Sequence, residues 1–228
     1  MRFTRYAVYF TPPPGPLAAF GAAWLGWDSA QGRRVMLPPV AGLPVPLSEI
    51  TATPRKYGLH ATLMAPFNLS DGYRHKDLQA ALAGLGQRLS PVMLDALALR
   101  RIGGFLALAP QGETAALNLL AARVVRDLQP LRAPVTEQDL ARRRSPGLTP
   151  RQDALLQEWG YPYVMEEFRF HITLTGKRPK GELPGITAAL EGLLLPLLPR
   201  PYEIDALSLM GEDAAGRFHL IHRQTLTA

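Results

Sequence analysis

The 228-residue chain contains no cysteine, and this absence excludes several kinds of site. A chain without thiols cannot form a disulfide framework, a thiolate metal site, an iron–sulfur cluster or a cysteine nucleophile. We therefore expect a cytoplasmic protein. The residues before the first apolar run contain no signal-like core, so we also expect no export signal.

Long apolar runs and glycine-rich nucleotide loops are also missing. The most apolar stretch, residues 183–198, contains Glu191 and Pro196 and falls short of the roughly 20 apolar residues that span a bilayer. Neither a G-x-G-x-x-G motif nor a Walker loop is present, so nucleotide folds that depend on such loops have no support. We expect no membrane partner.

The composition is that of a globular protein with excess positive charge. Hydrophobic residues make up 47% and charged residues 19%, which excludes disorder and a coiled coil. The chain has 25 basic and 19 acidic residues, a net charge of +6, and most of the basic residues are arginine, whose planar guanidinium suits phosphate. An anionic partner fits this balance. A codon preference for arginine, with a charge that serves only solubility, fits it equally well.

Apolar periodicity predicts an α+β fold, because hairpins of antiparallel strands are mixed with helices. The predicted strands cover 5–10, 57–67, 93–101, 105–109, 168–175, 202–210 and 218–225. The predicted helices cover 17–25, 75–89, 113–128 and 186–195, with an interrupted helical stretch over 136–159 that is broken at 145–147. The proline-rich connection over 37–54 is long for a compact domain, which indicates a loop near a site or a hidden short element.

Two pentapeptides share the form apolar-His-apolar-Thr-Leu, at residues 59–63 and 170–174. Side chains alternate along a strand, so each copy places its histidine and threonine on one face and its apolar residues on the other. A single such histidine is most simply a half-buried, hydrogen-bonded side chain. Two matching copies in a chain with five histidines favour a site. Each copy precedes a helix, so a pseudo-twofold axis could direct both pairs into one cleft.

These residue types match the needs of phosphodiester chemistry. In-line attack requires a base for the nucleophile and an acid for the leaving alkoxide, and His60 and His171 can serve as both near neutral pH. The hydroxyls of Thr62 and Thr173 can donate to the charged phosphate oxygens. The sequence does not assign which histidine is the acid.

The paired H-x-T motifs resemble the 2H phosphoesterase superfamily, which includes the LigT-like RNA ligases and cyclic phosphodiesterases. Residues 5–14, 55–63 and 168–176 are similar to a bacterial branch associated with phosphonate-utilisation operons. The resemblance covers nearly the whole chain. It implies one bilobal α+β domain over 1–228, with two antiparallel sheets around a central cleft, pseudo-twofold symmetry and helices outside. It also implies catalysis by His60 and His171, substrate binding by Thr62 and Thr173, and neither metal nor cofactor.

One position departs from the family pattern. Related sequences carry a basic residue just after the first H-x-T-L, and Met64 stands there in this chain. Arg169 is the candidate replacement in substrate binding, since on a regular strand it shares a face with His171, although an exposed strand-end arginine is the alternative. Tyr57 is a further substrate-binding candidate, because its ring could stack on a base or sugar.

Other charged residues and histidines have simpler interpretations. We interpret the run 142–144 as a solvated helix face and Lys177 as a solvated loop cation that could rim the cleft. His219 and His222 lie three positions apart on a predicted strand, on opposite faces, and we expect no shared metal ion.

The expected function is hydrolysis of a small cyclic phosphate by a monomer. The substrate would be a nucleoside 2′,3′-cyclic phosphate or a sugar cyclic phosphate of phosphonate metabolism. An RNA-binding protein of the same fold and an RNA-end ligase are the alternatives, with RNA as partner. Steeply salt-dependent RNA affinity without cleavage of any cyclic phosphate would favour the binding protein.

Overall fold

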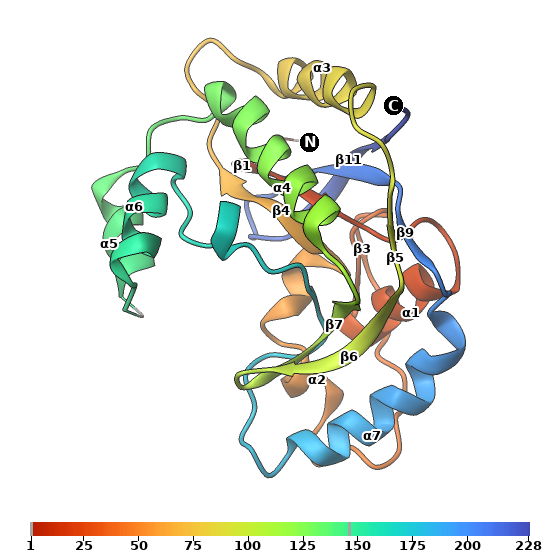
Figure 1. Cartoon of the computed structure of the whole chain (residues 1–228). Helices are drawn as coiled ribbons and strands as arrows, with labels where there is room; N and C mark the ends of the chain where they lie inside the picture. Colours follow the sequence, from red (N-terminus) through yellow and green to blue (C-terminus); the bar gives the residue numbers. More distant parts are fainter. Residues whose placement is uncertain (1, 146) are drawn as a thin grey trace.

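One antiparallel sheet forms the centre of the computed structural model, which describes residues 2–145 and 147–228 (Figure 1). Its seven strands have the order β11-β10-β1-β4-β8-β7-β6. Their bounds are β1 Arg5–Phe10, β4 Ala61–Phe67, β6 Ala96–Ile102, β7 Phe105–Gln111, β8 Ile172–Thr173, β10 Ala206–Glu212 and β11 Phe218–Thr225. Two small pairs accompany it: β2 Trp27–Asp28 with β3 Arg33–Arg34, and β5 Val92–Leu94 with β9 Tyr202–Ile204.

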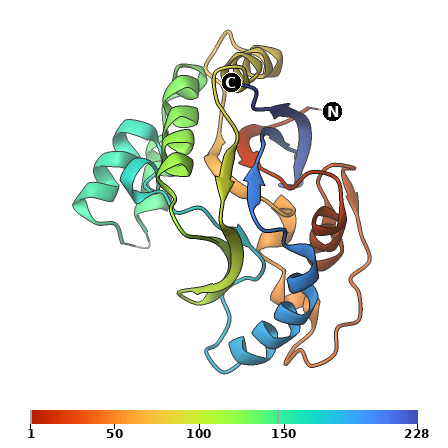
Figure 2. The same cartoon turned by 45° about the vertical axis from the view of Figure 1, so that its right-hand side comes forward.

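The helices lie outside the sheet, and the predicted α+β fold class is confirmed. Helix α3 packs on β10 and β11, α4 on β4, and α7 on β6 and β7, while α5 and α6 stand together beyond α4 (Figures 1 and 2). The α-helices are α1 Pro16–Leu25, α2 Leu47–Ile50, α3 His75–Gly86, α4 Ala115–Leu128, α5 Glu137–Arg144, α6 Pro150–Trp159 and α7 Leu183–Leu194. The 3-10 helices are η1 Pro54–Tyr57, η2 Gln129–Leu131, η3 Met165–Glu167 and η4 Leu195–Leu197. No helix within the described ranges is both long and apolar enough to cross a bilayer.

A row of buried apolar side chains crosses the central strands of the sheet. Phe10 pairs with Ala61, Ala61 with Ile172, and Ile172 with Leu108, and all four are fully buried. The pair Ala61–Ile172 is the link that joins the four strands of one half to the three strands of the other. Ala61 and Ile172 are also the central residues of the two H-x-T motifs, so the predicted core-facing side of each motif is confirmed.

The proline-rich connection over 37–54 contains a hidden short element, which was the second explanation for its length. It includes α2 and ends at the first residue of η1, and the strand predicted over 57–67 begins only at Ala61. The delay arises at Gly58, whose φ of 72° turns the chain sharply after η1. A side chain there would be strained, and its Cβ would lie 2.8 Å from the Ser29 hydroxyl.

The predicted strand over 168–175 is also shorter, being reduced to β8. The N–H groups of Leu174 and Thr175 both donate to the Leu106 carbonyl, at 3.0 and 3.3 Å, so the regular ladder ends after Thr173. The interrupted helical stretch is confirmed as α5 and α6. Pro146, within the predicted break, lies outside the described residues.

Candidate functional site

A cleft of about 600 Å³ opens on the face of the sheet opposite the central apolar row. This volume suits a small-molecule ligand. Both halves of the sheet contribute to its wall, together with η1 and α5. Tyr57, His60, Thr62 and Thr173, four of the six predicted site residues, line it. His171 lies beside it, with its ring 5.8 Å from that of Phe105, a lining residue.

The two histidines are oriented in the same way. The Nδ1 of His60 donates to the Gly58 carbonyl at 2.9 Å, and the Nδ1 of His171 donates to the Arg169 carbonyl at 2.8 Å. In each motif the acceptor is the carbonyl two residues earlier, which requires the hydrogen on Nδ1 and leaves Nε2 for other partners. The Thr62 hydroxyl lies 3.3 Å from the Nε2 of His60.

Strand register brings the two motifs together. Ala61 faces Ile172 in antiparallel register, so His60 and Thr62 flank one residue of this pair and His171 and Thr173 flank the other. The neighbouring His171 also contributes to lowering the pKa of His60, so the two imidazoles lie near each other.

Aromatic rings enclose His60 but leave His171 more open. The Tyr9 ring lies 4.1 Å from that of His60 and the Tyr57 ring 5.3 Å away. Burial lowers the pKa of His60 to about 4; the Gly58 hydrogen bond opposes this shift and the neighbouring His171 adds to it. His171 is half-buried. At neutral pH, His60 is therefore uncharged.

This low pKa predicts a pH-dependent stability. Between pH 6.5 and about 4 the unfolded chain binds a proton at His60 that the folded chain does not bind, so the free energy of unfolding decreases as the pH falls. We expect His60 to account for a loss of about 2 kcal/mol between pH 7 and pH 4.5. Urea unfolding of the wild type and of His60→Gln at both pH values measures it. An equal pH dependence of the two proteins would contradict the burial of a neutral imidazole.

Arg169 and Met64 do not line the cleft. Arg169 is exposed, does not line the cleft, and donates to the carbonyls of Glu166 and Phe168, both at 2.7 Å. Its role in substrate binding stays a prediction. Met64 is buried in the core, 2% exposed, because an irregular register between β1 and β4 near Val8 interrupts the alternation after Thr62.

Five cations also line the cleft: Arg5, Lys56, Arg142, Arg143 and Lys177. The interpretation of 142–144 as a solvated helix face holds for Arg142, which is 60% exposed and pairs with Asp139, and for Arg144, which pairs with Asp153 of α6. It is wrong for Arg143, which is half-buried over the Tyr161 ring. Lys177 lines the cleft, as expected if it borders the cleft and is not simply a solvated loop cation. Besides Lys177, a sequence signal existed for Arg5, which shares the face of Tyr9 on β1 by strand alternation.

The remaining histidines lie apart from the cleft. His219 bonds to Asp213 at 2.8 Å and His222 to Gln224 at 3.3 Å, so they have separate partners. Within the described ranges, no group of three or more His, Cys, Asp or Glu side chains is arranged to hold a metal ion.

Known proteins similar to this chain include two curated relatives and a solved structure. A protein of Janthinobacterium sp. (strain Marseille) named ribose 1,5-bisphosphate phosphokinase PhnN is 40% identical over 219 residues, covering 93% of this chain and 48% of the relative. A Laribacter hongkongensis protein of the same name is 35% identical over 213 residues, covering 93% of this chain and 49% of the relative. The chain thus spans about half the length of both. E. coli LigT in its apo form has a TM-score of 0.44 and 17% identity, covering 100% of each chain.

A family model also matches most of the chain. It covers residues 62–219 and is described as "Protein of unknown function (DUF1045)". The matched range includes β4 from Thr62 onward, helices α3 to α7 and the whole second H-x-T motif. The chain belongs to this family.

Proposed function

We propose that the cleft hydrolyses a small cyclic phosphate by acid–base catalysis at His60 and His171. The observation that carries this proposal is the matched pair of motifs across Ala61–Ile172, in which a carbonyl two residues earlier holds each Nδ1. Each imidazole then directs Nε2 to substrate. The resemblance to the 2H phosphoesterases supports the same function.

The environments of the two histidines favour distinct roles. His60 is uncharged at neutral pH and takes a proton from the attacking water as the water oxygen bonds to phosphorus. His171, more open to solvent, donates a proton to the alkoxide as the ring P–O bond breaks. Thr62 and Thr173 donate to the non-bridging oxygens. The product is a phosphate monoester, and the two imidazoles return to their starting states by exchange with solvent.

The charges of the cleft favour a sugar cyclic phosphate with a second phosphate group. Two of the five cations are paired with carboxylates, Arg5 with Glu212 and Arg142 with Asp139, and the other three still exceed the charge of one monoanionic diester. The curated relatives are named for ribose 1,5-bisphosphate, which is the compound that forms when a 1,2-cyclic phosphate of ribose 5-phosphate opens at O2. A kinase of the named type would consume this product. The phosphonate-operon branch that the flanking segments resemble also favours a sugar over a nucleoside.

The test is turnover of cyclic phosphates in excess EDTA. We expect the wild type to convert 5-phosphoribose 1,2-cyclic phosphate to a monoester, followed by ³¹P NMR, more rapidly than nucleoside 2′,3′-cyclic phosphates. Chelation should leave the rate intact, because the two imidazoles supply both proton transfers. Activity that disappears with EDTA and returns with a divalent ion would refute the metal-independent mechanism, and no turnover of any cyclic phosphate would refute the function.

A further inference from the structure

Arg143 is half-buried at the cleft and lacks an acidic partner among the described residues. Its guanidinium lies over the Tyr161 ring, 5.0 Å from the centroid, and its buried Nε has no hydrogen-bond partner in the described ranges. Nearby carboxylates are bound by other arginines. The pairs are Glu212 with Arg5, Asp139 with Arg142, and Asp153 with Arg144.

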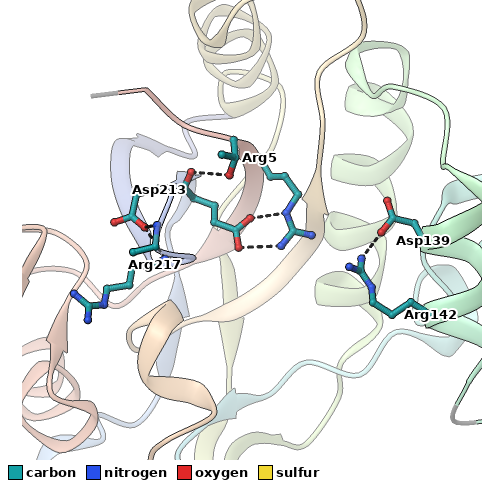
Figure 3. A network of polar contacts seen from close by, with 8 residues as sticks. Arg5, Asp139, Arg142, Asp213 and Arg217 are labelled. Atoms are coloured by element: carbon teal, nitrogen blue, oxygen red, sulfur yellow. Dashed lines mark hydrogen bonds and ion pairs between the residues drawn. The ribbon is translucent and has the colours of Figure 1, made fainter.

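Arg5 approaches the same place from the sheet. Its Nε and Nη2 bind Glu212 at 2.5 and 2.9 Å, which leaves Nη1 on the side away from that carboxylate. Figure 3 shows the Arg5 guanidinium facing the Asp139–Arg142 pair of α5. Arg5 and Arg143 line both the cleft and a narrow crevice beside it.

Arg132 adds a third guanidinium behind them. It lines the crevice, donates to the carbonyls of Trp159 and Gly160, and has a buried Nε without a partner in the described ranges. Burial, together with the neighbouring Arg143, lowers the pKa of Arg132 to about 10. Burial also lowers the pKa of Arg143, and Arg142 and Arg5 contribute to the shift. Asp139 also lines the crevice and opposes both shifts, but Arg142 binds its carboxylate. Three guanidiniums thus share the crevice with one carboxylate, and a bound anion would offset their remaining repulsion.

We propose that Arg5 and Arg143, with Arg132 behind them, form a subsite for a second phosphate group of the substrate, and so determine which cyclic phosphates are accepted. This inference rests on the proposed function and adds the residues that select the substrate. The Tyr9 ring lies beside His60, 4.1 Å away, and so marks the reacting end of the cleft. Arg5 is on the same face of β1, four residues or about 13 Å along the strand from Tyr9. The subsite therefore holds the far end of a small sugar and not the reacting phosphate. The guanidinium fork matches a dianionic monoester.

Two substrates that differ only in the second phosphate test this selection. We expect wild type to prefer 5-phosphoribose 1,2-cyclic phosphate over ribose 1,2-cyclic phosphate in kcat/KM. Arg143→Ala should lower kcat/KM for the first by roughly 10- to 100-fold, mostly through KM, and for the second by much less. Arg143→Lys, which keeps the charge without the fork, should fall between. The matched control is Arg144→Ala, the next residue of α5, whose side chain pairs with Asp153.

Ribose 5-phosphate provides a readout that needs no turnover, since it carries the second phosphate and no diester. Calorimetry should show binding to wild type and Arg144→Ala, and binding roughly 10- to 100-fold weaker to Arg143→Ala. Equal binding by all three proteins, or an equal fall of kcat/KM on both cyclic substrates in Arg143→Ala, would overturn the subsite. The expected binding pattern without turnover of any cyclic phosphate would support the subsite and refute the proposed hydrolysis.

Discussion

Replacing either His60 or His171 with alanine is expected to reduce kcat by roughly 10²- to 10⁴-fold, the range for removal of a positioned acid or base. KM should change much less, because Thr62, Thr173 and the cations that line the cleft remain to bind the phosphate groups. Steady-state kinetics on one cyclic phosphate measures both parameters. His75→Ala is the matched control, since His75 is exposed at the start of α3.

The pH dependence of the rate separates the two histidines. His60 must be uncharged to accept a proton, and its pKa of about 4 places the acid limb of kcat/KM near pH 4, below the usual range of a histidine. His60→Ala should lose this limb together with most of the rate. A His60→Ala or His171→Ala protein with wild-type rate and profile would mean that the motifs are structural.

Replacing Thr62 or Thr173 with valine is expected to reduce kcat by roughly 10- to 1000-fold. Valine keeps the shape of the side chain but cannot donate to a phosphate oxygen, whose charge increases in the transition state. Each threonine is half-buried at the cleft wall, so the substitution should leave the fold intact. The pH profile should keep its shape because both imidazoles remain.

The control for this pair is Thr227→Val, at an exposed position near the end of the chain. A fall in kcat with little change in KM indicates an interaction made chiefly in the transition state. Unchanged kcat in both Thr62→Val and Thr173→Val would contradict the assignment of the hydroxyls to the phosphate.

Strand alternation was enough to predict much of the site. Because side chains alternate along a strand, the motifs alone placed His60 with Thr62 and His171 with Thr173 opposite a buried core, and the buried pair Ala61–Ile172 confirms the core side. The sequence could not show that these two central residues face each other. Long-range register is set by the packing of the whole sheet, and here one pair links its halves.

The cationic wall of the cleft depends on tertiary packing that local pattern does not report. Arg142, Arg143 and Arg144 are consecutive on α5, yet the first two line the cleft while Arg144 pairs with α6. A helix with no buried residues has no apolar stripe from which its orientation can be predicted. The low pKa of His60 likewise depends on Tyr9, which β1 brings from far away in the sequence.

The central claim is that both imidazoles act on one phosphate, and the double variant His60→Ala/His171→Ala tests it most directly. Groups that act as a unit are strongly non-additive, so we expect the kcat of the double variant to lie within about tenfold of the slower single variant. All three variants would be measured on the same cyclic phosphate in the same buffer. Losses that multiply, so that the double variant is slower by the product of the two single effects, would contradict the claim.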